Sequence, residues 1–200
     1  MIDPLDAAAM AAQLGRAPRG QLDVAHRCPC GLPDVAQTAP RLPDGSPFPT
    51  LYYLTCPRAA AAVSSLEASG LMREMTERLA DDALRERYLA AHRDYLARRD
   101  EAASTAGVER LPSGTQSAGG MPERVKCLHA LVAHELVTGV NPFGREALDA
   151  IGAWWTAGPC VPAAAPSAPM SGPAAGPASG SSGPASGSSG PASGPAPGEG

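Results

Sequence analysis

The C-terminal segment of the chain limits where a folded core can form. From Val161 to Gly200 every residue is Pro, Ala, Ser or Gly except Val161, Met170 and Glu199. The unit Gly-Pro-Ala-Ser-Gly-Ser-Ser occupies 176–182 and again 183–189. Such side chains bury too little apolar surface to offset the entropy lost on ordering. We therefore predict a single domain over residues 1–158 and a disordered, low-complexity tail over 159–200.

The remaining stretch of roughly 155 residues is long enough for one hydrophobic core. The net charge of the whole chain is −4, and a domain that binds nucleic acid usually carries a basic patch, so we expect no nucleic-acid partner. No stretch approaches the roughly 20 apolar residues that span a membrane. Residues 1–20 lack the basic start and apolar run of a signal peptide. We expect a cytoplasmic protein, whose cysteines are reduced, metal-bound or catalytic rather than paired in disulfides.

Hydrophobic periodicity predicts an α+β fold. Short apolar or alternating runs, with a turn at Pro43-Asp44-Gly45, indicate strands, and from Pro57 onward the apolar spacing becomes helical. We expect a small, mostly antiparallel sheet packed with about five helices, and a loop over 103–122. The expected strands are 22–26, 35–39 and 51–55, and the expected helical stretches are 6–14, 57–70, 71–79, 84–95, 122–138 and 144–155.

The first of three clusters of cysteine and histidine is His26-Arg27-Cys28-Pro29-Cys30-Gly31. If residues 26–30 are extended, the side chains of His26, Cys28 and Cys30 project from the same face. That arrangement suits metal ligation. A disulfide between Cys28 and Cys30 would close a very small, strained ring, so we discount it.

The second cluster surrounds Cys56, which follows a predicted strand and precedes a predicted helix. The positive end of a helix dipole and its free N–H groups lower the pKa of a thiol and favour anions. Arg58 adds a positive charge nearby. Cys56 is therefore a candidate for a nucleophilic or metal-binding thiolate.

The third cluster is Lys126-Cys127-Leu128-His129, followed by His134. On a helix that includes the whole cluster, Cys127 and His134 share a face and His129 lies nearly opposite. We expect Cys127 and His134 to point into one site, and His129 to join them only if the helix begins after it. Cys160, at the edge of the tail, has no such neighbours and is left out of the prediction.

Together the clusters supply enough soft ligands for one tetrahedral zinc ion or an iron–sulfur cluster. The ligands would come from three separated segments, so metal binding would help to hold the fold together. A single cysteine is more often a buried, small apolar side chain; the joint pattern favours a shared site. The candidate ligands are Cys28, Cys30, Cys56 and Cys127, with His26, His129 or His134.

Four strings of the sequence are His26-Arg27-Cys28-Pro29-Cys30-Gly31-Leu32-Pro33, then Phe48 to Pro57, Leu66 to Leu71, and Arg124 to Ala130. They resemble the bacterial family of proteins of unknown function numbered 501, in an actinobacterial version. The resemblance covers about residues 15–157. It implies that Cys28, Cys56, Cys127 and His129 lie in motifs of the family, and that Cys30 is a less constant position.

Two further functions stay open at this point. The first is an enzyme with Cys56 as nucleophile and His129 or His134 as base, whose helix N-terminus binds an anionic substrate. The second is a non-catalytic adaptor in division or envelope assembly, which binds a protein partner and uses the tail as a tether. That second hypothesis comes from the resemblance, since family members in actinobacteria are often encoded near a septum-formation initiator.

Overall fold

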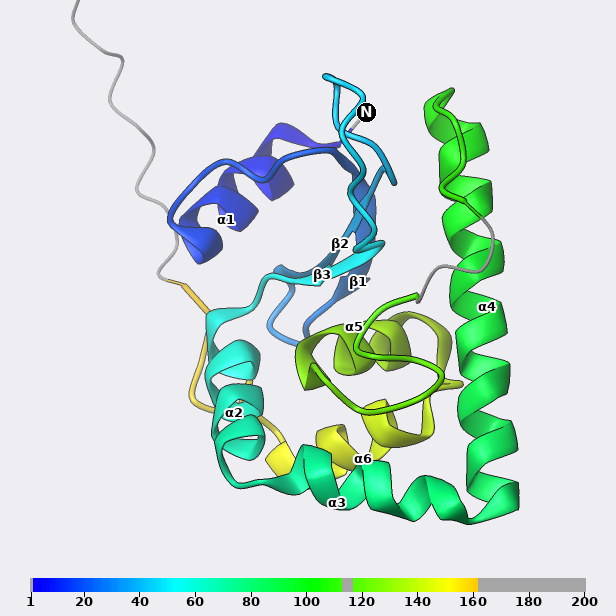
Figure 1. Ribbon diagram of the computed structural model, residues 1–200. Helices are drawn as coiled ribbons and strands as arrows, with labels where there is room; N and C mark the ends of the chain where they lie inside the picture. The colour runs from blue at the N-terminus through cyan, green and yellow to red at the C-terminus, as the bar shows by residue number, and fades with distance from the viewer. Residues whose placement is uncertain (1, 113–116, 162–200) are drawn as a thin grey trace, which may run out of the picture. The chain divides into compact units, whose positions relative to one another are not determined.

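The computed structural model describes residues 2–112 and 117–161. These residues form a sheet of three antiparallel strands with helices around it (Figure 1). These residues belong to one structural unit, Met1–Ala165. The predicted α+β fold is confirmed. Residues 162–200 of the predicted disordered tail lie outside the described part. None of the helices in that part combines the length and the apolar character needed to cross a membrane.

The sheet has the order β1–β2–β3 and is antiparallel throughout. Its strands are β1 (Gln21–Arg27), β2 (Pro33–Thr38) and β3 (Tyr52–Leu54), close to the three predicted runs. The central strand β2 is almost entirely buried. The predicted turn between β2 and β3 is present, and Gly45 adopts a φ of +81° there, a value that a residue with a side chain rarely takes.

Helices α1 (Pro4–Leu14) and α5 (Leu128–Thr138) pack directly on the sheet. Helix α1 contacts β2, and α5 contacts β3 and lies between the sheet and α6 (Pro142–Ile151) (Figure 1). Helices α5 and α6 approach very closely at Gly144, where an added Cβ would lie 2.2 Å from the carbonyl oxygen of Leu131. Only glycine fits at that position.

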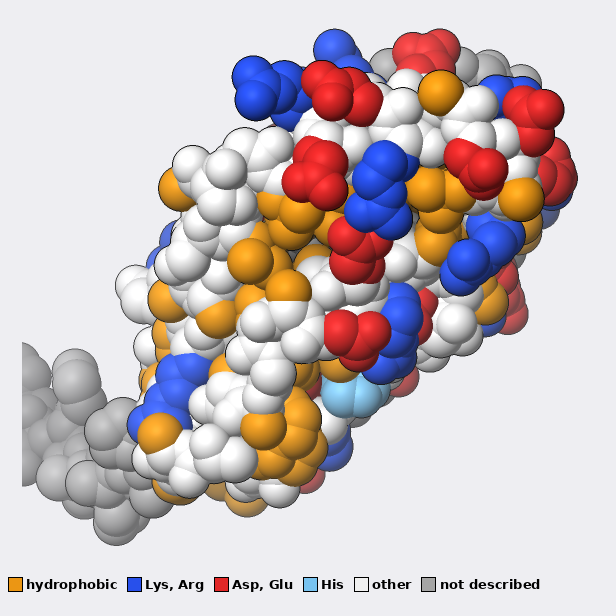
Figure 2. Space-filling view, turned by 90° about the horizontal axis from the view of Figure 1, so that it is seen from below, with side chains coloured by type: hydrophobic (Ala, Val, Ile, Leu, Met, Phe, Trp, Pro, Cys, Tyr) orange, Lys and Arg blue, Asp and Glu red, His pale blue; other side chains and the backbone are white. Residues whose placement is uncertain are grey.

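The other helices follow one another around this centre. They are α2 (Pro57–Ala68), α3 (Leu71–Glu77), a 3-10 turn (Arg78–Ala80) and α4 (Asp82–Ala106). The Arg78 guanidinium forms two hydrogen bonds with the Glu146 carboxylate, 2.7 and 2.9 Å long, which tie the 3-10 turn to α6. The face seen from below carries acidic and basic side chains in alternation, with apolar side chains exposed between them (Figure 2).

The boundaries of three helices differ clearly from the prediction. Helix α6 ends at Ile151 instead of 155, with Gly152 as its C-cap residue. Helix α4 continues to Ala106, into the expected loop, and α5 begins at Leu128 instead of 122. The backbone N–H groups of Lys126 and Cys127 donate to the carbonyl of Gly119, so they cannot continue a helix. Gly119 and Gly120 both have positive φ. Residues 118–127 therefore form a loop, and Cys127 is the N-cap residue of α5 rather than part of the helix.

His134 belongs to the buried centre of the domain. Its Nε2 lies 3.0 Å from Oδ2 of Asp94, and its Nδ1 lies 3.3 Å from the amide nitrogen of Asn141. An amide nitrogen only donates, so Nδ1 accepts and Nε2 carries the proton. The ring also stacks on Tyr52 and meets the edge of Tyr95. Burial lowers the pKa of His134 despite the opposing effect of Asp94, which keeps the ring neutral in the fold.

We predict that His134 makes the fold less stable in mild acid. Because the folded-state pKa of His134 is lowered, the unfolded chain binds the proton first, near the usual pKa of about 6.5. Stability that is present above that pH is then lost as the pH falls below it, by at most about 1.4 kcal/mol per pH unit. Urea unfolding of the wild type and of His134→Gln between about pH 7.5 and 5.5 tests this. The variant should lose less stability over that range, and equal losses would contradict the prediction.

Candidate metal centre

The register of the sheet brings the first two cysteine segments together. His26 of β1 and Leu54 of β3 both pair with Val35 of the central strand. Since both outer strands run antiparallel to β2, they end at the same end of the sheet. Cys28 directly follows β1, and Cys56 follows β3 as the N-cap residue of α2.

Cys28 and Cys30 lie in a tight turn between β1 and β2. The N–H of Gly31 donates to the carbonyl of Cys28 at 2.8 Å, and the N–H of Cys28 donates to the carbonyl of Leu32 at 2.9 Å. Gly31 has a φ of +88°. The condition that residues 26–30 are extended is therefore not met beyond Arg27, because the chain turns at Cys28. The turn still directs both sulfurs to one place.

Cys160 supplies a fourth sulfur that the sequence prediction left out. Its Sγ lies 2.9 Å from that of Cys56, 3.5 Å from that of Cys30 and 3.8 Å from that of Cys28. The segment before it is held to α2, because Arg58 donates a 2.9 Å hydrogen bond to the carbonyl of Gly158. We name Cys28, Cys30, Cys56 and Cys160 the four-thiol cluster. All of its members are free thiols.

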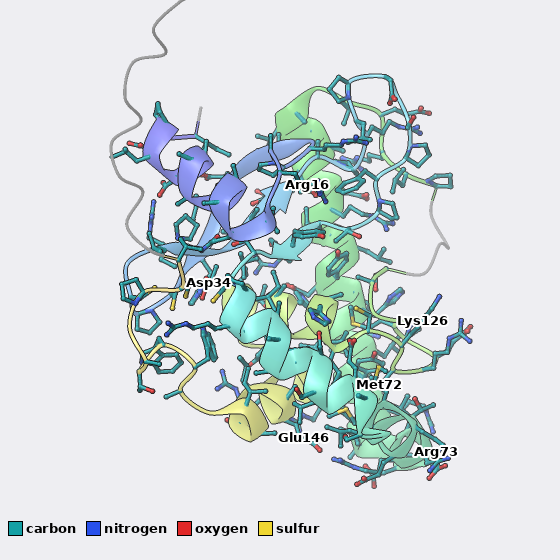
Figure 3. The ribbon with its side chains drawn as sticks, turned by 90° about the vertical axis from the view of Figure 1, so that its left-hand side faces the viewer. Arg16, Asp34, Met72, Arg73, Lys126 and Glu146 are labelled. Carbon is teal, nitrogen blue, oxygen red and sulfur yellow. The ribbon has the colours of Figure 1, made fainter. Side chains whose placement is uncertain are left out.

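The sulfurs of Cys28, Cys30 and Cys160 all lie within 4.8 Å of one another, and Cys56 joins them through its contact with Cys160. Four sulfurs bound to a tetrahedral zinc ion at about 2.3 Å lie about 3.8 Å from one another. The separations of Cys160 from Cys30 and Cys28 are near this value, and its separation from Cys56 is shorter. Figure 3 shows sulfur atoms close to the labelled Asp34, where the sheet meets the first turn of α2.

The cluster is enclosed, and its environment acts unequally on the thiols. Cys56 is completely buried, Cys28 and Cys160 nearly so, and Cys30 is half-buried. Burial raises the pKa of the Cys28 thiol to about 11 and also raises that of Cys160. At Cys30 burial acts in the same direction, but the N–H groups of Leu32 and Cys160 and the neighbouring thiols outweigh it and lower the pKa. N–H groups directed at a sulfur stabilise a thiolate.

His26 does not join the cysteines that follow it. Its Nδ1 lies 2.7 Å from Oδ1 of Asp34, which is fully buried at the start of β2. The hydrogen bond with Asp34 raises the pKa of His26. This contact fixes the end of β1 against β2, so His26 supports the turn that carries Cys28 instead of acting as a ligand with it.

Cys127 and His129 lie in a separate group with Glu67 of α2. One ligand atom from each of these three residues lies within 4.8 Å of the other two. Nδ1 of His129 is 3.1 Å from Oε1 of Glu67, and the same oxygen accepts the N–H of Leu128 at 2.6 Å. The contact with Cys127, followed by that with Glu67, raises the pKa of His129 to about 9 against the effect of burial. We name these residues the Glu67 group.

The structure thus divides the predicted ligands between two places. Cys28, Cys30 and Cys160 lie within 4.8 Å of one another and Cys56 contacts Cys160, while Cys127 and His129 meet at Glu67. The prediction that Cys127 and His134 point into one site is wrong, because α5 begins only after Cys127. Cys160 and Glu67 are the residues that sequence reasoning missed. A lone cysteine beside a low-complexity tail, and a glutamate on a helix, carry no local signal of ligation.

The candidate nucleophile Cys56 has no access to solvent in this arrangement. Its side chain is completely buried and its sulfur faces Cys160. A nucleophilic cysteine needs a partially exposed position next to its base. The candidate base His129 instead contacts Glu67 and Cys127.

We predict that Cys56 reacts slowly with alkylating agents. In native protein at about pH 7, iodoacetamide should label Cys56 at least about 100-fold more slowly than in urea-unfolded protein, because labelling requires local opening. Peptide mass spectrometry over a time course measures both rates, and the partly exposed Cys127 serves as an internal reference. Labelling of Cys56 that is faster in the native than in the unfolded protein would restore the nucleophile hypothesis.

Comparison with known proteins agrees with the resemblance seen in the sequence. The pattern of a family described as "Protein of unknown function (DUF501)" matches residues 24–149, which is more than half of the chain. No curated protein and no solved structure matches the chain. The matched range includes Cys28, Cys30, Cys56 and the whole Glu67 group, whereas Cys160 lies beyond it. The chain belongs to the DUF501 family.

Proposed function

We propose that this protein binds one zinc ion through the four thiolates of Cys28, Cys30, Cys56 and Cys160. The observation that carries the proposal is the position of the Cys160 sulfur, which lies within 3.8 Å of the three other sulfurs. These cysteines come from the β1–β2 turn, the start of α2 and the segment after α6. Zinc binds four thiolates in a closed tetrahedron at structural sites.

Packing alone accounts poorly for this arrangement. A buried cysteine can act as a small apolar side chain, and the neighbours of such a side chain can be of any apolar type. Here the neighbours of Cys160 are the three other cysteines of the cluster, brought from positions more than 100 residues away. N–H groups also support the sulfur of Cys30. Shared metal ligation explains why four sulfurs, instead of four aliphatic side chains, meet at one point.

The separations between the sulfurs favour a single ion over an iron–sulfur cluster. A cluster distributes its cysteine ligands over several iron atoms, so their sulfurs lie farther apart than those around one ion. The three separations of Cys160 do not exceed the value of about 3.8 Å for a tetrahedral zinc site. The enclosed position also fits a structural site, in which no coordination position stays open for a substrate.

In this function the metal acts as a clamp between distant segments. It would join the end of β1, the N-terminus of α2 and the C-terminal segment of the domain. Because the unfolded chain has no preformed site, the free energy of metal binding adds to the free energy of folding. Helix α2 carries Glu67 and its N-cap is Cys56, so the clamp also fixes the helix that supports the Glu67 group.

We predict that the purified protein contains zinc at this cluster and that losing it destabilises the fold. Elemental analysis should find zinc, and Cys160→Ser should remove one equivalent. Removing zinc with a chelator should lower Tm by on the order of 10 °C, since a ligand present at a thousandfold its Kd contributes about 4 kcal/mol. Differential scanning calorimetry with and without the chelator measures this shift.

The matched control for this experiment is Cys127→Ser, which changes a cysteine outside the cluster. After substitution of Co²⁺ for zinc, a strong thiolate-to-metal absorption should appear in the wild type and persist in Cys127→Ser. It should be lost or strongly reduced in Cys160→Ser and Cys56→Ser. Protein that holds less than about a tenth of an equivalent of any metal and binds no Co²⁺ through several thiolates would overturn the proposal. Iron with inorganic sulfide would overturn the choice of zinc.

A further inference from the structure

The Glu67 group forms a second set of metal-binding side chains, separate from the four-thiol cluster. Glu67 comes from the last turn of α2, while Cys127 and His129 flank the first residue of α5. A carboxylate, a thiol and an imidazole thus lie within 4.8 Å of one another. These are the three types of side chain that bind zinc in proteins.

The distance between two of the ligand atoms fits one metal ion. An imidazole nitrogen and a carboxylate oxygen bound to the same tetrahedral zinc ion, each at about 2.0–2.1 Å, lie about 3.3 Å apart. Nδ1 of His129 and Oε1 of Glu67 are 3.1 Å apart. In the metal-free protein a proton lies between these atoms. A metal ion that replaces the proton needs only a small movement of the two side chains.

The second nitrogen of His129 is held as it is in known metal sites. Nε2 lies 3.1 Å from the backbone carbonyl of Ala60, with the hydroxyl of Ser64 at 3.4 Å. A histidine that binds a metal through one nitrogen usually donates the N–H of the other to a carbonyl or a carboxylate, which fixes the ring orientation. Glu67 is fixed as well, since it accepts the first free N–H of α5 from Leu128.

The Glu67 group is open on one side, unlike the four-thiol cluster. The His129 and Glu67 side chains are 29% and 24% exposed. Cys127 and His129 line a cavity of about 660 Å³ whose other walls include Leu14, Tyr53 and Leu54. Two of the three ligands, Cys127 and His129, thus lie at the wall of this cavity. Three protein ligands leave the fourth coordination position of a tetrahedral ion free. Zinc sites of this kind hold a water molecule or a substrate there, whereas four-cysteine sites are closed.

We propose that Glu67, Cys127 and His129 form a second site for Zn²⁺, with an open coordination position that faces the cavity. The site goes beyond the proposed structural zinc, because none of its ligands belongs to the four-thiol cluster. Each site can therefore be emptied without changing a ligand of the other.

Competition with a chromophoric zinc chelator tests the proposal on the full chain. Metal-free wild-type protein should bind two equivalents of Zn²⁺, and both Cys127→Ser and Cys160→Ser should bind one. In Cys127→Ser the Co²⁺ spectrum should keep the strong absorption of several thiolates, while the Co²⁺ that remains in Cys160→Ser should show that of one thiolate. Circular dichroism identifies any variant that fails to fold.

Two conservative variants separate ligation from a general effect on structure. Glu67→Gln keeps an oxygen that can accept the Leu128 N–H but loses the charge, and it should weaken the second site at least about tenfold with little change in Tm. Glu74→Gln, at an exposed position of α3, is the matched control and should leave both affinities unchanged. Because neither variant changes a ligand of the four-thiol cluster, this comparison holds even if Cys160→Ser does not fold.

The possible outcomes distinguish this site from the structural one. A wild type that binds a single equivalent, lost in Cys160→Ser and kept in Cys127→Ser, would overturn the second site and leave the structural zinc in place. A single equivalent lost only in Cys127→Ser would overturn the structural zinc instead. Two equivalents that persist in Cys127→Ser and Glu67→Gln would show that the second ion binds elsewhere, which also overturns the proposal.

Discussion

The antiparallel register of the small sheet is the constraint on which the other features depend. Val35 pairs with His26 on one side and Leu54 on the other, so β1 and β3 end at the same place. A shift of one residue in either pairing would turn the side chains of that strand to the opposite face. Cys28 and Cys56 would then no longer both reach Cys160. The hydrogen bond between His26 and Asp34, at the same end, helps to hold this register.

Helix α2 links this end of the sheet to the centre of the domain. Its N-cap residue, Cys56, belongs to the four-thiol cluster, and Glu67 in its last turn accepts the first N–H of α5. Helix α5 in turn contacts β3 and α6. One helix therefore carries a side chain of each group of candidate ligands, and its position is set by contacts at both ends.

The sequence predicted what depends on local patterns. Short apolar or alternating runs located the three strands, and Pro57 located the start of α2, because strand and helix periodicities act over a few residues. The start of α5 escaped prediction, because it depends on hydrogen bonds from Lys126 and Cys127 to Gly119 and on an acceptor from Glu67, far away in sequence. The role of Cys160 was not predicted for a similar reason. Its partners precede it by more than 100 residues, and its sequence neighbours resemble the tail.

The residues that match the family pattern include every member of the Glu67 group but not every member of the four-thiol cluster. Glu67, Cys127 and His129 all lie within the matched residues 24–149, together with three members of the four-thiol cluster. Cys160, the fourth member, lies beyond that range. A relative that shares only the matched region would keep three thiolates at the end of the sheet, and a metal bound there would have an open fourth position instead of a closed shell. The Glu67 group draws no ligand from outside the matched region. The proposed open site can therefore exist wherever the family sequence retains these three residues, whereas the proposed closed site also requires the segment that follows α6.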